Sequence, residues 1–284
     1  MSAQWPQLLY SLLVCFGSGT LAFLGISEVT ASAHRSRKAV AIAAALLLLL
    51  GGVALVVSRG DINAVISMMN GATRGNFKSL AIVGTILSLF VAIAYTIVIF
   101  RADSYADEDE DADTGTAGKI LGIIALIFGI ALPVLMGLAD APVRVPWTKW
   151  AAPLAYLGNA LAMGGTLAVS IIALGKSEIR EFSRYSLLAL VAVALQTAFF
   201  AIFAGNAGFA FDALTFWGGV VVIGCVIPLV CMAMAPKIRT LVFVATIGTV
   251  IGGICIRLLM QALAAGNPGL NLIFAATQHA SLVG

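Results

Sequence analysis

The sequence predicts an all-α integral membrane protein with eight transmembrane helices, and its composition, the length of its apolar runs and the charge of its loops support this fold class. Of its 284 residues, 61% are hydrophobic and 10% are charged, whereas a soluble domain carries about 25% charged residues. Apolar runs of about 20 residues, long enough to cross a bilayer as a helix, recur along the chain. Helices are expected because each run must pair its own backbone groups in lipid. We therefore expect a multi-pass protein of the plasma or inner membrane.

The apolar runs divide the chain into eight expected spans. They are Leu8 to Ile26, Ala39 to Val57, Leu80 to Phe100, Ile120 to Ala139, Ala151 to Leu174, Tyr185 to Ala204, Ala213 to Ala235 and Ile238 to Ala264. The loops between them are each under about 20 residues, too short to fold alone. The whole chain, residues 1–284, is therefore expected to be one transmembrane domain.

A short internal similarity relates the first and fifth spans. Gly17-Ser-Gly-Thr-Leu-Ala22 is similar to Met163-Gly-Gly-Thr-Leu-Ala168, and both spans run in the same direction across the membrane. This predicts two four-helix halves, about 1–140 and 141–284, arranged as a parallel repeat. A second interpretation is that the small residues simply let neighbouring helices approach closely.

The basic residues of the loops predict the orientation. If both termini lie outside, the inner loops hold ten Lys and Arg residues and the outer loops hold five. The inner set is Arg35, Arg37, Lys38, Arg101, Lys119, Lys176, Arg180, Arg184, Lys237 and Arg239, and the outer set is Arg59, Arg74, Lys78, Arg144 and Lys149. The positive-inside rule therefore predicts that both termini are outside.

Metal-binding patterns are absent from the sequence. His34 and His279 both lie outside the spans, so paired axial histidines for a haem within the membrane are not available. The four cysteines fall inside apolar runs without a CxxC spacing, which predicts buried hydrophobic side chains and no metal site. The acidic run from Asp103 to Asp113 is typical of a solvated linker, with docking or cation binding as the alternative.

Arg257 is the main functional candidate within a span. Apart from Arg239 at its start, the last apolar run carries no other charge, and a guanidinium inside a bilayer marks a functional site by default. Counted from Arg239 at about 1.5 Å per residue, Arg257 lies near the far edge of a core about 30 Å thick. It is therefore either part of a polar pocket or an interfacial anchor that reaches water.

Other polar residues meet Arg257 at the predicted outer face. Ser58 and Arg59 directly follow the second span, Asp61 and Asn63 come next in the loop, and Gln261 lies one turn after Arg257. A cation and amides can donate hydrogen bonds to a quinone carbonyl, and a carboxylate beside them can accept protons from a quinol. The sequence therefore predicts a quinol site there. The alternative is that these are ordinary solvent-exposed loop residues that bind no ligand. The remaining outer basic residues are candidate docking contacts for an acidic partner: Arg74, Lys78, Arg144 and Lys149.

The order of several short elements resembles a known family. The elements are Trp5-Pro6, Cys15-Phe16-Gly17, Gly60 with Met69-Asn70, Val145-Pro146-Trp147, Pro153, Met163-Gly164-Gly165, Trp217 and Ile256-Arg257. In this order and spacing they are similar to the DmsC group, the membrane anchor subunits of dimethyl-sulfoxide-reductase-type molybdenum oxidoreductases, itself similar to the NrfD-type quinone-interacting subunits.

The resemblance implies an eight-helix anchor that oxidises menaquinol at the outer face, in electron transport of the kind used in anaerobic respiration. Electrons would pass to an iron-sulfur subunit and then to a catalytic subunit with a molybdopterin cofactor, while the anchor itself holds no cofactor. The chain departs from the family at three positions: the family's site histidine falls at Ser58, its glutamate near Ser79 or Leu80, and the acidic residue before the last arginine at Gly253. Our hypothesis is that Asp61 replaces the proton acceptor, with Arg59 and Arg257 positioning the quinol oxygen.

Two other functions fit the same sequence. A small-molecule transporter would place ligands near the midplane beside broken helices, and Pro133, Pro153 and Pro228 within spans are compatible with it. An inert anchor that has lost quinol binding would explain the departures at Ser58 and Leu80. If the chain is an anchor, the sequence does not name the terminal substrate of the complex, because that specificity would lie in a partner subunit.

Overall fold

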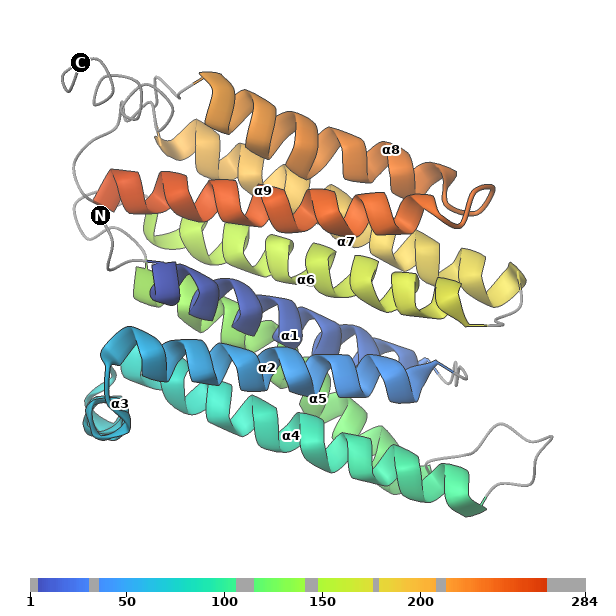
Figure 1. Cartoon of the computed structure of the whole chain (residues 1–284), viewed down its shortest axis with the longest axis horizontal. Helices are drawn as coiled ribbons and strands as arrows, with labels where there is room; N and C mark the ends of the chain where they lie inside the picture. The colour runs from blue at the N-terminus through green and yellow to red at the C-terminus, as the bar shows by residue number, and fades with distance from the viewer. Residues whose placement is uncertain are drawn as a thin grey trace, which may run out of the picture.

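The computed structural model describes residues 5–30, 36–105, 115–140, 148–175, 179–207 and 213–264. These residues form helices that lie side by side, with the short helix α3 across one end of the array (Figure 1). The α-helices are α1 (Trp5–Val29), α2 (Arg37–Arg59), α3 (Ile62–Met69), α4 (Phe77–Tyr105), α5 (Gly115–Asp140), α6 (Thr148–Leu174), α7 (Ile179–Ala207), α8 (Ile227–Met234) and α9 (Leu241–Ala264). A 3-10 helix, η1 (Asn70–Arg74), follows α3, and a π-helix, η2 (Ala213–Val226), precedes α8.

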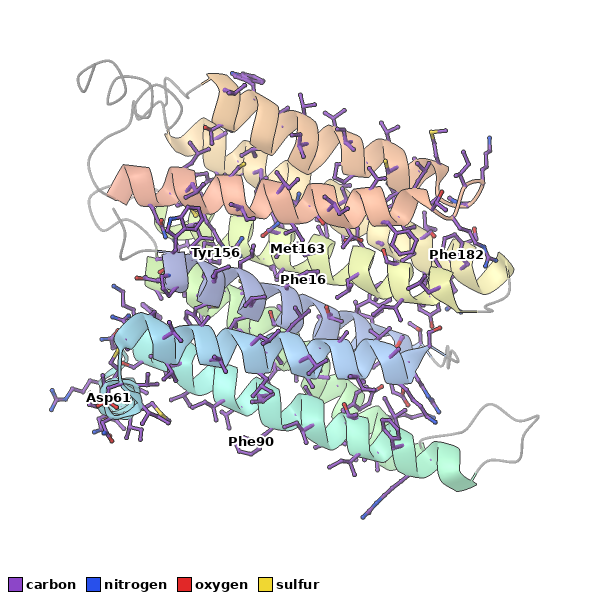
Figure 2. All side chains as sticks on the ribbon, in the orientation of Figure 1. Phe16, Asp61, Phe90, Tyr156, Met163 and Phe182 are labelled. Carbon is purple, nitrogen blue, oxygen red and sulfur yellow. The ribbon has the colours of Figure 1, made fainter. Side chains whose placement is uncertain are left out.

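The eight predicted spans are confirmed as helices. In the described part of the chain, eight helical segments are long and apolar enough to cross a membrane. Large apolar side chains such as Phe90, which is 65% exposed (Figure 2), project outward from them. Such a surface is unsuited to water and suits contact with lipid acyl chains. The chain is therefore a multi-pass membrane protein by its helices.

Helices α1 and α6 form the centre of the bundle. In the most apolar window of α1, 78% of the residues are buried, compared with 33% in α2. Helix α1 packs against α2, α5 and α6, while α6 also packs against α7 and α9. The helices α1, α2, α4 and α5 thus form one group, and α6 to α9 with η2 form the other. The internal repeat stays a prediction, because packing alone does not test it.

Glycines allow the backbones of α1 and α6 to approach closely. A Cβ atom on Gly19 would overlap the Ala160 carbonyl, and one on Gly164 would overlap the backbone of Gly19. These glycines lie within the two similar segments of the first and fifth spans. Their role as small residues at a helix contact is therefore confirmed.

The connection from α2 to α4 is a compact helical structure. Gly60, at φ 76°, ends α2 with its N–H on the Val56 carbonyl, and Asp61 then caps α3 by accepting from the Asn63 N–H (3.1 Å). Gly75, at φ 72°, ends η1 in the same left-handed conformation. We call this end of the bundle, where α1 begins and α9 ends, the α3 end (Figure 1). The loop charges predict that it lies outside.

The seventh span is irregular, because its first part is the π-helix η2. The Gly224 carbonyl of η2 accepts a hydrogen bond from the Gln196 side-chain amide of α7 at 2.6 Å. This contact links η2 to the buried polar residues described below.

Candidate functional site

Arg257 of α9 lies inside the bundle. Its side chain is 2% exposed. Its Nη1 donates to Asn159 Oδ1 on α6 (2.7 Å) and to the Gly253 carbonyl one turn earlier in α9 (2.9 Å). Its guanidinium carbon lies 4.7 Å from the centre of the Tyr156 ring, in a cation–π contact. Arg257 therefore belongs to a buried polar cluster and is not an interfacial anchor that reaches water.

Asn159 is held by a network that fixes its orientation. Its Nδ2 donates to Gln196 Oε1 (3.1 Å) and to the Thr249 carbonyl (3.2 Å). Because both amide hydrogens are engaged by acceptors, the oxygen must face Arg257. Gly253 makes room for this arrangement, since a Cβ there would lie 2.5 Å from Asn159 Oδ1. Asn159 thus occupies the space beside the position at which the resembled family carries an acidic residue.

The guanidinium of Arg257 has unused hydrogen-bonding capacity. Its Nε and Nη2 have no hydrogen-bond partner in the part of the chain that the structure describes. No described carboxylate forms an ion pair with it. Removing a cation from water carries an effective penalty of several kcal/mol, and unmatched buried donors add to it. A ligand oxygen, from a carbonyl, hydroxyl or anionic group, is the chemistry that these two donors fit.

Tyr156 connects the buried cluster to the α3 end. Its hydroxyl donates to Asp140 Oδ2 at 2.6 Å. Asp140 is the last residue of α5 and is half-buried. Arg257, Tyr156 and Asp140 are therefore in contact one after another from the bundle interior to its end, since the Tyr156 ring faces Arg257 and its hydroxyl binds Asp140.

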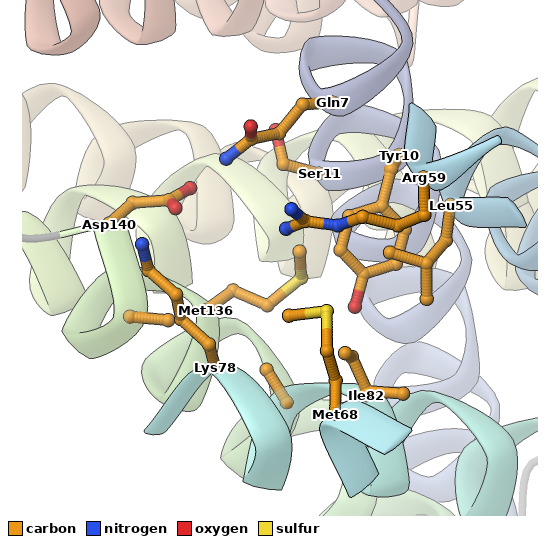
Figure 3. A pocket seen from close by; sticks show the side chains of 12 residues that line it. Gln7, Tyr10, Ser11, Leu55, Arg59, Met68, Lys78, Ile82, Met136 and Asp140 are labelled. Carbon is orange, nitrogen blue, oxygen red and sulfur yellow. The ribbon is translucent and has the colours of Figure 1, made fainter. Parts of the chain in front are cut away.

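A pocket opens beside Asp140 at the α3 end (Figure 3). It lies between α1, α2, α3, α4 and α5, and contains about 430 Å³ of empty space. About 30 Å³ of this is open to the centre of a water molecule, which is enough for about two waters. Figure 3 shows the cationic ends of Arg59 and Lys78 directed toward the part of the pocket near Asp140. The polar side chains that line it are Gln7, Tyr10, Ser11, Arg59, Lys78 and Asp140.

Two of the predicted quinol-site residues belong to this arrangement. Arg59 lines the pocket directly. Arg257 does not line it, but is joined to it through Tyr156 and Asp140. Arg59 and Asp140 thus line the same pocket, whereas Arg257 is connected to Asp140 through Tyr156.

The other predicted site residues have local contacts outside the pocket lining. The Ser58 hydroxyl donates to the Leu55 carbonyl within α2 (2.7 Å). Asp61 is exposed and accepts from the backbone and the side chain of Asn63 (3.1 to 3.4 Å). Gln261 is half-buried on α9. None of these four lines the pocket.

The predicted docking residues lie in different environments. Arg74 is exposed on η1, whereas Lys78 lines the pocket at the start of α4. Arg144 and the side chain of Lys149 lie outside the described residues, as do His34, His279 and the acidic run after Tyr105. In the remainder of the chain, no group of three or more metal-ligating side chains comes together.

The sequence interpretation missed Asp140, Tyr156 and Asn159. Tyr156 and Asn159 are three residues apart, which places them on one face of α6, and both are polar residues in a span with few others. That spacing was the available signal. Asp140 had no comparable signal, since a carboxylate at the end of a span is expected to face water.

No protein-family model matches this chain, and neither the curated proteins nor the solved structures give a match. The functional argument therefore depends on the site's own geometry.

Proposed function

We propose that this chain is the membrane anchor and quinol-oxidising subunit of a molybdopterin oxidoreductase complex. It takes electrons from menaquinol at the outer face and passes them to an iron-sulfur subunit, which supplies a molybdopterin-containing catalytic subunit. The clusters and the molybdopterin belong to those partners. The observation that supports the proposal is the path from the buried Arg257, which has two unused donors, through Tyr156 to a carboxylate in an open pocket.

The pocket residues suit the chemistry of a quinol. Oxidation of a quinol releases two electrons and two protons, so a proton acceptor must lie beside the hydroxyl group and have access to water. Asp140 meets both requirements, because it is half-buried and lines a pocket with room for water. Arg59 and Lys78 supply donors for the quinol oxygen. Since the pocket has room for only about two waters, the exposed side chains of Arg59 and Lys78 must turn outward to admit a ring.

Geometry supports Asp140 as the first proton acceptor, whereas the sequence alone pointed to Asp61. Asp61 is exposed and already caps α3. We therefore expect Asp140→Asn to slow menaquinol oxidation by the assembled complex by about 100-fold or more, as for loss of a general base. Asp61→Asn is the matched control, and should keep the cap on α3, because Asn caps a helix about as well as Asp.

The two variants separate the two assignments. The rate of menaquinol oxidation is measured in membranes, with an artificial donor to the iron-sulfur subunit as the control for assembly. Severe slowing by Asp61→Asn alone would restore Asp61 as the acceptor. Full turnover by both variants would remove carboxylate chemistry at this pocket from the proposal.

Quinone binding distinguishes an active subunit from an inert anchor. A quinone analogue should bind the isolated complex, and Arg59→Gln should weaken that binding because the variant removes a charged donor from the pocket. Absence of binding by the unmodified complex would favour the inert anchor.

Partner docking is proposed at the same end of the bundle, through Arg74, Lys78, Arg144 and Lys149. Arg74 gives the clearest test, because it is exposed and lies outside the pocket lining. Arg74→Glu should reduce retention of the iron-sulfur subunit during purification in mild detergent. Retention equal to that of the unmodified chain would exclude docking at Arg74.

A further inference from the structure

A second hollow lies between α7 and α8, at the end of the bundle opposite the α3 end. It is an open groove of about 920 Å³. Leu187, Leu190, Met232, Ala233 and Pro236 form its apolar wall. We call this hollow the α7–α8 groove. It shares no lining residue with the pocket beside Asp140.

A cation–π contact lies next to the α7–α8 groove, involving Phe182, the neighbour of the lining residue Ser183. The guanidinium carbon of Arg239, before α9, lies 4.9 Å from the ring centre of Phe182 on α7. Phe182 is buried, at the end of the bundle away from Asp61 (Figure 2). This contact fixes the start of α7 against the turn that follows α8. Ala233 of α8 contributes a small side chain to the groove lining beside that turn.

One end of the groove is basic. Arg184 and Ser183 line it where α7 begins, and Lys237 directly follows the lining residue Pro236. The side chains of Arg184 and Lys237 are exposed, and neither forms a hydrogen bond or ion pair with another described part of the chain. Along the sequence, the segments 176–184 and 237–239 carry five basic residues against two acidic ones: Lys176, Arg180, Arg184, Lys237 and Arg239 against Glu178 and Glu181.

The groove points from this basic end into the bilayer. Leu190 lies six residues after Arg184 on α7, which is about 9 Å along the helix axis. A ligand that fills the groove therefore needs an anionic group at the membrane surface and a hydrocarbon chain below it. An inorganic anion satisfies only the first requirement, and a zwitterionic lipid lacks the net charge.

We propose that the α7–α8 groove binds one anionic phospholipid from the leaflet on this side. The phosphate contacts Arg184 and Lys237, and an acyl chain lies along Leu187 and Leu190. Basic pockets between transmembrane helices recognise anionic head groups in this manner, with each Lys or Arg near the surface contributing about a fivefold gain in affinity. The groove is separate from the quinol pocket, so this inference does not rest on the proposed function.

The test is native mass spectrometry of the full chain in detergent, with equimolar phosphatidylglycerol and phosphatidylcholine added. The unmodified chain should retain phosphatidylglycerol in preference to phosphatidylcholine. Arg184→Gln combined with Lys237→Gln should weaken phosphatidylglycerol binding about 25-fold. Lys119→Gln is the matched control, because it removes an exposed charge at the same end of the bundle, on α5, outside the groove lining.

A second variant tests the groove itself. Ala233→Trp keeps both charges but fills the apolar wall, so it should also reduce phosphatidylglycerol retention. Equal retention of the two lipids by the unmodified chain would overturn the proposal. So would unchanged phosphatidylglycerol binding in either the double charge variant or Ala233→Trp.

Discussion

The contact between Arg257 and Asn159 allows a quantitative test of the buried cluster. Replacing Asn159 with Leu removes the only side-chain acceptor of the guanidinium among the described residues. The Nη1···Oδ1 distance of 2.7 Å is that of a charge-assisted hydrogen bond. Such a bond is worth about 1.5 to 3 kcal/mol, whereas hydrogen bonds between membrane helices average only about 0.6 kcal/mol. The two values are far enough apart for a double-mutant cycle to separate them.

The expected losses of unfolding free energy follow from the polar groups that each substitution leaves without a hydrogen-bond partner. Asn159→Leu strands the Arg257 cation and removes the donors to Gln196 Oε1 and the Thr249 carbonyl. We expect the free energy of unfolding to fall by about 3 kcal/mol, because a buried charged group is left without its side-chain acceptor. Arg257→Met should cost less, because it also removes the desolvated charge. In the double variant, the loss of unfolding free energy should be smaller than the sum of the two single losses by about 1.5 to 3 kcal/mol.

The assay is reversible unfolding in mixed detergent micelles, followed by circular dichroism. Asn159→Leu combined with Lys119→Gln is the control, and its losses should add to within about 0.5 kcal/mol because distant sites are independent. A coupling energy between Asn159 and Arg257 of about 0.6 kcal/mol or less would refute the charge-assisted contact. The guanidinium would then be satisfied in another way.

Two further predictions concern the packing. Gly164→Val should severely reduce folding yield, because even the Cβ atom of valine would overlap the α1 backbone. Gly52→Val is the control and should be tolerated, because a Cβ there meets nothing within 4 Å. The yield of protein in a detergent-stable form checks both variants, and equal yields would contradict the close approach of α1 and α6. Tyr95→Phe should lower the free energy of unfolding by about 1.5 to 3 kcal/mol, because it removes a hydroxyl that donates to Glu28 Oε2 at 2.7 Å. An unfolding curve that coincides with that of the unmodified chain would exclude a contribution from this bond.

The spans were predictable because a bilayer imposes a simple length requirement. For example, Ala151 to Leu174 was predicted from apolarity alone, and α6 extends only to Thr148 on one side. The helix α3 was missed because eight residues do not cross a membrane. Its signal was the pair Ile62 and Ile66, four residues apart on one helix face.

The site was only partly predictable, since its parts come from separate helices. Arg257 was evident because a charge in an apolar run is costly. Its partners Asn159 and Tyr156 are on α6, nearly 100 residues earlier in the sequence. Asp140 becomes a site residue only when Tyr156 packs beside it. Such long-range contacts depend on helix packing, which local patterns do not encode.

The most direct test of the central proposal is affinity purification of this chain from its native membrane in mild detergent. Mass spectrometry identifies both the co-purifying proteins and the extracted quinones. The proposal predicts recovery of an iron-sulfur subunit, a molybdopterin subunit and menaquinone together. Recovery of the chain alone, without quinone, would contradict it and favour a small-molecule transporter.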